Sequence, residues 1–190
     1  PTIAELNAIA AKTTGVVTAT LAANSLANLS DLTTAGTDAI TITVNDADAA
    51  ALTAANLSTL GGKTAGTVTV TNAVEITGDH DQLIAALVTA STKVAASDAT
   101  VTINDADTTA ITASELAVVG AATTGTVTVT NAVIITGDHD QVTAALVTTS
   151  TKVAVSDAAV TINDADTTAI TASELSAIGG ATTGTVTVTN

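Results

Sequence analysis

A tandem repeat of 59 residues is the feature that most constrains how this chain can fold. The segment Asn-Asp-Ala-Asp begins at positions 45, 104 and 163, and Gly-Thr-Val-Thr-Val-Thr-Asn begins at positions 66, 125 and 184. When residues 41–99 are aligned with residues 100–158, 41 of the 59 positions are identical. A repeat this close implies that each copy forms the same unit and that the units stack on their neighbours.

The repeat divides the chain into one divergent segment, two full copies and one partial copy. We assign residues 1–40 to divergent, capping-type N-terminal coils, 41–99 to repeat 1, 100–158 to repeat 2 and 159–190 to a partial repeat 3, all in one continuous solenoid. The first segment keeps an eroded form of the pattern, since Thr-Ile-Ala-Glu-Leu at residues 2–6 resembles Thr-Ala-Ser-Glu-Leu at residues 112–116. Erosion of this kind is typical of a terminal repeat.

Short runs in which Val or Ile alternates with Thr recur in every copy. This two-residue period predicts half-buried strands with the aliphatic side chains on one face. Seven such runs predict seven stacked coils of alternating length. The positions that we align are Val17, Ile42, Val68, Val101, Val127, Val160 and Val186, with steps of 25, 26, 33, 26, 33 and 26 residues.

Helix-start signals lie between the strand runs. Residues 112–115 and 171–174 have the form of a capping box, in which a hydroxyl is followed three residues later by a carboxylate; residues 79–82 and 138–141 offer the same arrangement with Asp. We therefore predict an α/β solenoid of about seven strand–helix coils, built from the 59-residue double-coil repeat. Each coil is expected to contain a strand, a turn, a short second extended piece and a helix of one to three turns. Its architecture is similar to that of leucine-rich-repeat proteins, although their LxxLxLxxN motif is missing. An all-β solenoid, with these segments as loops, is the alternative.

The composition argues against several classes of function. Eighteen acidic residues accompany four lysines and no arginine, giving a net charge of −14. This balance argues against binding to nucleic-acid phosphates or to an anionic membrane surface. No apolar run approaches the ~18 residues of a membrane span, so we predict no membrane insertion. The absence of cysteine excludes disulfides, thiolate metal sites and cysteine nucleophiles.

The Asn-Asp-Ala-Asp segments place paired aspartates in turns that directly follow strands. Closely spaced carboxylates are ligands that Ca²⁺ prefers, so a calcium site is one interpretation. The other is an ordinary Asn/Asp turn, which we favour because neither an EF-hand loop nor a GGxGxD repeat is present. The candidate calcium ligands are Asp46, Asp48, Asp105, Asp107, Asp164 and Asp166.

Two histidines, His80 and His139, lie between aspartates in repeated Gly-Asp-His-Asp-Gln segments. An Asp-His-Asp cluster would suit a transition metal or an acid–base pair, but either role needs a concave and partly dry pocket. Acidic residues in the first turn of a helix are expected from its dipole. We therefore interpret both segments as helix starts, and we predict no catalytic residue and no enzymatic activity.

Threonine supplies a further candidate site. If the valines of the Gly-Thr-Val-Thr-Val-Thr-Asn segments face inward, the threonines face outward in an array spaced ~6.7 Å along the strand and ~4.8 Å between coils. This array is similar to the face of solenoid ice-binding proteins, whereas the simpler interpretation is that Thr is a soluble strand former. The residues of the array are Thr67, Thr69, Thr71, Thr126, Thr128, Thr130, Thr185, Thr187 and Thr189.

The two ends of the chain predict self-association. Neither end carries a charged or proline-rich cap, so we expect either that the protein continues or that one molecule stacks on the next. Val-Thr-Val-Thr-Asn at residues 186–190 followed by residues 1–15 approximates a short coil. Head-to-tail stacking is a contact that does not close, so it would form a filament. Lateral association is the alternative.

Acidic, arginine-free repeats that are rich in Thr, Ala, Val and Gly and lack cysteine resemble the repeat regions of large secreted bacterial proteins. These include surface-layer proteins, haemolysin-type proteins and giant adhesins. The resemblance implies an extracellular or cell-surface location, often with calcium. It favours a non-enzymatic structural role as a rigid spacer, a surface-layer element or a self-assembling filament element. The alternative function is an ice- or glycan-binding solenoid that uses the threonine array.

Overall fold

Parallel strands and short helices alternate along the chain. The computed structural model describes residues 1–92, 94–151 and 153–189. The predicted α/β class is confirmed, and the all-β alternative is wrong because the capping-box segments form helices. The seven helices of the described chain are α1 (Ile3–Ala10), α2 (Leu26–Leu29), α3 (Ala54–Gly61), α4 (His80–Leu87), α5 (Ala113–Gly120), α6 (His139–Leu146) and α7 (Ala172–Gly179).

The strands form three sheets, and every paired strand runs parallel to its neighbours. The first sheet has the order β1 (Thr18–Thr20), β2 (Ala39–Val44), β4 (Val68–Val70), β6 (Val94–Ala95). The middle sheet has the order β3 (Ala51–Thr53), β5 (Glu75–Gly78), β7 (Thr100–Ile103), β9 (Val127–Val129), β11 (Val153–Val155). The third sheet has the order β8 (Ala110–Thr112), β10 (Ile134–Gly137), β12 (Ala159–Ile162), β13 (Val186–Val188).

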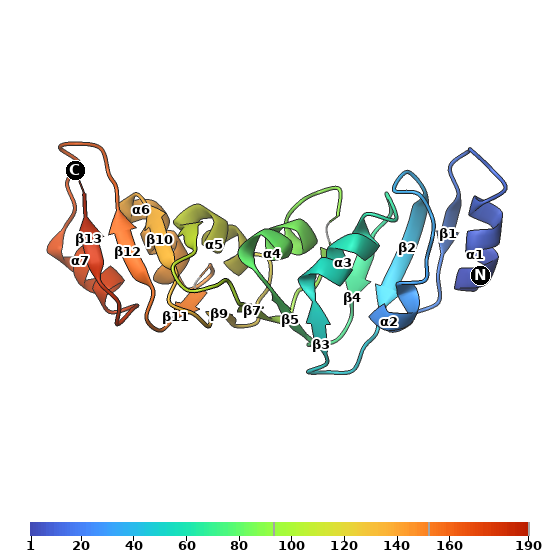
Figure 1. The fold of residues 1–190 in the computed structure, drawn as a ribbon, viewed down its shortest axis with the longest axis horizontal. Helices are drawn as coiled ribbons and strands as arrows, with labels where there is room; N and C mark the ends of the chain where they lie inside the picture. Colours follow the sequence, from blue (N-terminus) through green and yellow to red (C-terminus); the bar gives the residue numbers. More distant parts are fainter. Residues whose placement is uncertain (93, 152, 190) are drawn as a thin grey trace.

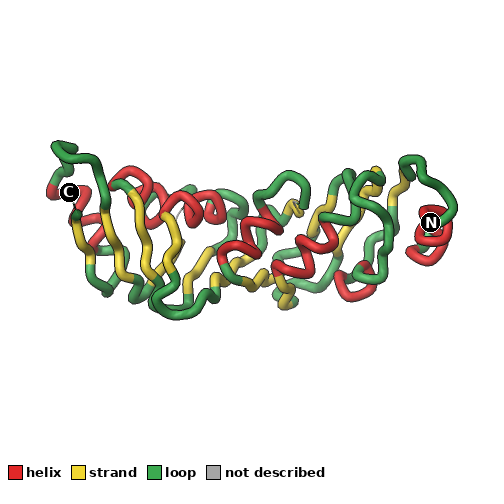
Figure 2. The backbone as a smooth tube through the Cα atoms, turned by 45° about the horizontal axis from the view of Figure 1, so that its top comes forward, coloured by secondary structure: helices red, strands yellow, loops and turns green. Residues whose placement is uncertain are grey.

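These elements follow one another along a single long axis. The two termini lie at opposite ends of the molecule (Figure 1). The turned view shows that the chain is gently bowed and that the helices succeed one another along its length (Figure 2). Consecutive helices from α3 to α7 contact each other. We use the word coil for the stretch of chain from one helix to the next.

The core is a set of ladders of aliphatic side chains that run across the strands. Val68 pairs with Ile42 on one side and with Val94 on the other, and all three are buried. The alternation of Thr and Val that predicted strands therefore places Val inward and Thr outward. Because the chain contains no aromatic residue, the core consists of Leu, Ile, Val and Ala.

The strand register differs from the prediction at the long steps and at the first step, where Ala19 pairs with Ile40 and Val17 does not pair with Ile42. Ile42 pairs with Val68 as predicted, but Val68 pairs with Val94 and not with Val101. Val101 instead joins Ile76, in the strand that directly precedes α4. The predicted series placed the first strands of all coils in one ladder, whereas β7 pairs with β5, the second extended piece of its coil.

Strand β7 explains the step of 33 residues. Strands β6, β7 and β8 follow one another without an intervening helix, so the chain passes from the first sheet through the middle sheet to the third. In the middle sheet, β7 pairs with β5 of the first full copy and with β9 of the second. One copy is thereby joined to the next through a shared sheet.

The predicted helix starts are confirmed. The four predicted capping boxes all form, with N-caps at Asp79, Thr112, Asp138 and Thr171. The eroded segment at residues 2–6 forms the same box, with its N-cap at Thr2. Each box satisfies backbone N–H groups that the first turn of a helix leaves without partners. Within the described chain, no helix is long and apolar enough to cross a membrane.

Candidate functional site

The first aspartate of each Asn-Asp-Ala-Asp segment reaches back to the start of a helix in the preceding coil. In every case a carboxylate Oδ2 accepts a hydrogen bond from the backbone N–H of the first residue of that helix. A negative charge is favourable there because the N-terminal end of a helix is partially positive. The pairs are Leu26 with Asp46 (2.7 Å), His80 with Asp105 (2.8 Å) and His139 with Asp164 (3.1 Å).

In the two full copies, the imidazole adds a second link to the same carboxylate. His80 Nδ1 lies 2.7 Å from Asp105 Oδ1, and His139 Nδ1 lies 2.7 Å from Asp164 Oδ1. The rings are only 13 % exposed, and both aspartates are buried. Because the partners are 25 residues apart, each pair fastens one coil to the next. We call these two pairs the His–Asp clamps.

Carboxylates raise the pKa of both imidazoles. Burial lowers the pKa of His80, but the hydrogen bond to Asp105 and the charges of Asp105, Asp81 and Glu115 outweigh it, so the net pKa is raised. At His139 the largest influence is the hydrogen bond to Asp164, which outweighs the opposing effect of burial. The charges that also raise the pKa of His139 are those of Asp164, Asp140 and Glu174.

The second aspartates of the segments have different partners from the first. Asp48 Oδ1 accepts a hydrogen bond from the Ala73 N–H at 3.2 Å, and Asp107 Oδ1 accepts one from the Ala132 N–H at 3.1 Å. The two carboxylates of a segment are thus held by separate backbone groups. Among the described residues, no three His, Asp or Glu side chains are grouped so that they could hold a metal ion. Calcium binding at these aspartates stays a prediction.

Each Asn-Asp-Ala-Asp segment makes a turn with unusual backbone geometry. The residue after the second aspartate has a positive φ, namely 58° at Ala49, 65° at Thr108 and 72° at Thr167. Side chains with a Cβ atom disfavour this region, and a β-branched residue such as Thr disfavours it most. The turn is therefore held by the hydrogen bonds around it and not by the preference of that residue.

The threonine array is divided among the sheets. All nine threonines are exposed, as predicted. However, Thr69 lies in β4 of the first sheet, Thr128 in β9 of the middle sheet and Thr187 in β13 of the third. The nine threonines therefore do not form one array on one sheet, because the equivalent strands of successive copies lie in different sheets. The rows that do form are Thr53, Thr77, Thr102 and Thr128 in the middle sheet, and Thr112, Thr136, Thr161 and Thr187 in the third.

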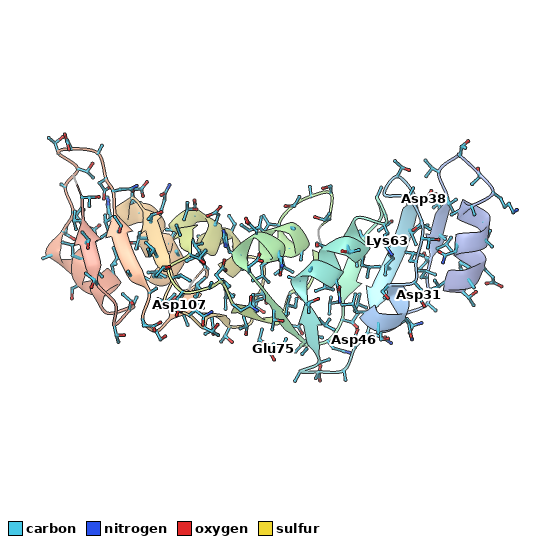
Figure 3. The ribbon with its side chains drawn as sticks, in the orientation of Figure 1. Asp31, Asp38, Asp46, Lys63, Glu75 and Asp107 are labelled. Carbon is cyan, nitrogen blue, oxygen red and sulfur yellow. The ribbon has the colours of Figure 1, made fainter. Side chains whose placement is uncertain are left out.

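A cavity of about 390 Å³ lies between α2 and α3 and is lined by Leu26, Leu52 and Leu60 among others. Helix α2 has four residues where α4 and α6 have eight, and it covers less of α3 than α4 does. Lys63 Nζ donates to the Ser30 carbonyl at 2.9 Å and to the Leu32 carbonyl. Figure 3 labels Lys63 and Asp46 in this region. The lysine therefore compensates the negative end of the short helix.

The sequence does not predict the His–Asp clamps, although it singles out both partners of each. The histidines lie at helix starts, as predicted, and the aspartates lie in the segments that follow strands. The signal that relates them is the spacing of 25 residues, found in both full copies. No protein-family model matches the chain, and no curated protein or solved structure is significantly similar to it.

Proposed function

We propose that this chain is a non-enzymatic, extracellular structural repeat protein: a solenoid rod that acts as a rigid spacer, surface-layer element or filament element. One observation carries the proposal. Each 59-residue copy adds equivalent elements along one axis, as the helices that begin at Ala54, Ala113 and Ala172 illustrate. A protein built in this way gains length with every copy while its cross-section stays the same.

The use of both histidines supports a role without catalysis. Each imidazole is held between a buried carboxylate and the start of a helix, so its ring nitrogen Nδ1 is engaged in fastening two coils. An acid–base group needs access to a bound substrate. We therefore assign His80 and His139 to stability.

Charge and exposed apolar side chains favour association through the ends of the rod over association through its sides. The net charge of −14 opposes close lateral packing of copies. Of the four exposed large aliphatic residues in the described chain, Ile9 and Val16 lie near one end and Val188 near the other, whereas Val118 lies in α5 between them. We propose the ends as the surfaces on which further coils stack.

The test lengthens the rod. A variant that repeats residues 100–158 once more after Ala158 should gain about 10–20 Å in maximum dimension, because it adds two coils whose strands are spaced ~4.8 Å apart and whose helices are spaced about 8–10 Å apart. Small-angle X-ray scattering should show this gain with an unchanged cross-section. The matched control inserts 59 Gly/Ser residues at the same place, which adds a flexible loop. A wider particle of unchanged length would contradict the proposal.

The same samples test calcium. If the aspartates bind Ca²⁺, the melting temperature should rise with added Ca²⁺ and fall with a chelator, because a ligand that binds only the folded chain stabilises it. An ice- or glycan-binding face is the second candidate function, and its support is limited to the four-threonine rows of the middle and third sheets.

A further inference from the structure

The outer face of α7 and β13 carries side chains whose counterparts elsewhere are buried. Ala54 and Ala113, at the first position of α3 and α5, are fully buried, whereas Ala172 at the first position of α7 is exposed. Val129 in β9 is 2 % exposed, but its counterpart Val188 in β13 is 43 % exposed. The third copy thus presents the same surface that the other two copies cover.

The last residue of α7, Gly179, likewise lacks the close neighbour that its counterparts Gly61 and Gly120 have. A Cβ atom at Gly61 would lie 2.0 Å from the Thr92 carbonyl oxygen, and one at Gly120 would lie 2.1 Å from the Thr151 carbonyl oxygen. The loop after the following helix therefore requires glycine at both places. At Gly179 a Cβ atom would meet nothing within 4 Å. No described residue requires glycine there, and glycine is a poor helix former.

The partners of the covered alanines specify what fits on this face. A Cβ atom at Gly78 would lie 2.9 Å from the Ala54 Cβ, and one at Gly137 would lie 3.0 Å from the Ala113 Cβ. These glycines end the strands that run into the Gly-Asp-His-Asp-Gln helices α4 and α6. A coil that covers Ala172 must therefore bring a glycine at the same place.

The edge of the third sheet adds a separate requirement. Strand β9 pairs with β7 on one side and with β11 on the other, and β4 is flanked by β2 and β6 in the same way. Within the described residues, β13 pairs with β12 alone. Its other edge offers a row of backbone groups for one more parallel strand.

We propose that the face formed by Ala172, Gly179, Val186 and Val188 is a docking surface for one further coil of the Gly-Asp-His-Asp-Gln type. This coil stacks on α7 and β13 as β10, α6 and β11 stack on α5 and β9. The inference rests on the proposed function in one respect, namely that coils stack at the ends. It also specifies which type of coil stacks on this face. Helix α1 of a second copy has a Thr/Glu capping box like that of α7 and not the Asp/Gln box of α6, so the N-terminal end of a second copy does not supply a coil of this type.

The experiment adds one further coil of the Gly-Asp-His-Asp-Gln type to the C-terminal end of the chain. A fusion places a copy of the sequence of residues 132–163 directly after residue 190, and Gly179→Ala is made in the fusion and in the original chain. In the original chain the substitution should leave the melting temperature unchanged or raise it by about 2 °C, because Ala favours the helix. In the fusion it should lower the melting temperature by about 5 °C, because the added loop carbonyl needs the space.

Gly120→Ala is the matched control, and it should lower the melting temperature by a similar amount in both backgrounds. Hydrogen exchange should also show that β13 amides become protected in the fusion. The proposal is overturned if Gly179→Ala has the same effect in both backgrounds, if the added coil remains unprotected or if Gly120→Ala is harmless. A dimer of the original chain that protects β13 would also overturn it, since a second copy would then cover this face. Scattering by the lengthened rod tests the proposed function separately.

Discussion

An aspartate of the next coil binds the start of helix α2 in the N-terminal segment and the start of helix α4 in the first full copy. The contacts that it makes differ between the two helices. Both helices have the carboxylate of an Asn-Asp-Ala-Asp segment on their first backbone N–H, from Asp46 and Asp105 respectively. At α4 the first residue is His80, which adds the imidazole link, whereas at α2 it is Leu26. The bond from carboxylate to helix start is therefore the common element, and the imidazole is an addition to it.

The two helices also differ in length, and the N-terminal segment makes up for the difference in another way. A cavity lies beside the short helix α2, and Lys63 binds the Ser30 and Leu32 carbonyls at the end of its single turn. The equivalent positions in the later copies are Ala122 and Ala181, which have no charge. A short helix with a lysine thus replaces a longer helix with a clamp.

The largest predicted effect comes from removing the clamp carboxylate. Asp105→Ala leaves the His80 N–H and a largely buried ring without their acceptor, so we expect a loss of about 2–4 kcal/mol of unfolding free energy. Asp46→Ala should cost about 1–2 kcal/mol, because only one backbone N–H loses its partner there. Urea denaturation of both variants measures the difference. Equal losses would mean that the imidazole link contributes nothing.

Asp107→Ala is the control for this comparison. Its carboxylate is exposed and accepts one backbone hydrogen bond, so the loss should stay below about 1 kcal/mol.

The positive-φ turns give a second comparison between copies. Thr108→Gly should stabilise the chain by about 1 kcal/mol, because glycine adopts this backbone conformation without strain. Ala49→Gly should gain about half as much, since Ala is less strained than the β-branched Thr. Thr109→Gly is the matched control and should destabilise. A loss of stability in Thr108→Gly would show that the methyl or hydroxyl of Thr108 matters more than its backbone strain. Thermal unfolding decides between these outcomes.

How far the sequence predicted this structure depends on the range of the interactions. The capping boxes at Asp79 and Thr112 are formed by residues three apart, so the local pattern predicted them. The inward valines followed from a two-residue period in the same way. The chain passes from one sheet to the next at β7 because β7 pairs with the distant strand β5. The alignment of the repeated valines does not show this pairing, since β5 is the second strand of its coil. The clamp between His80 and Asp105 joins positions 25 residues apart and becomes evident only when the coils are stacked.

A change of pH should alter stability less than either set of substitutions. The direction of this change follows from the raised pKa values of both imidazoles. Their contribution to stability is fully present below the pKa of an unfolded histidine, about 6.5. It is lost as the pH rises through the higher pKa of the folded state. The melting temperature should therefore fall by about 1 °C between pH 5.5 and pH 9.

The double variant His80→Leu/His139→Leu converts both full copies to the arrangement at Leu26 and should remove this dependence on pH. If the double variant kept the full pH dependence, the source would lie in other groups and not in the clamps.

The smallest predicted effect concerns the threonine rows, where the sheets themselves provide the comparison. Thr69→Lys and Thr128→Lys each replace an exposed side chain, so each should change the unfolding free energy by less than about 0.5 kcal/mol and leave assembly unaffected. Thr128 belongs to the four-threonine row of the middle sheet, whereas Thr69 in the first sheet has Thr43 and Ala95 as its neighbours. If the middle row binds ice, Thr128→Lys alone abolishes ice shaping and Thr69→Lys does not. Ice shaping that survives both substitutions, or is absent from the unmodified chain, removes the middle row as an ice-binding surface. The exposed threonines there would then serve only to keep a stack of strands soluble.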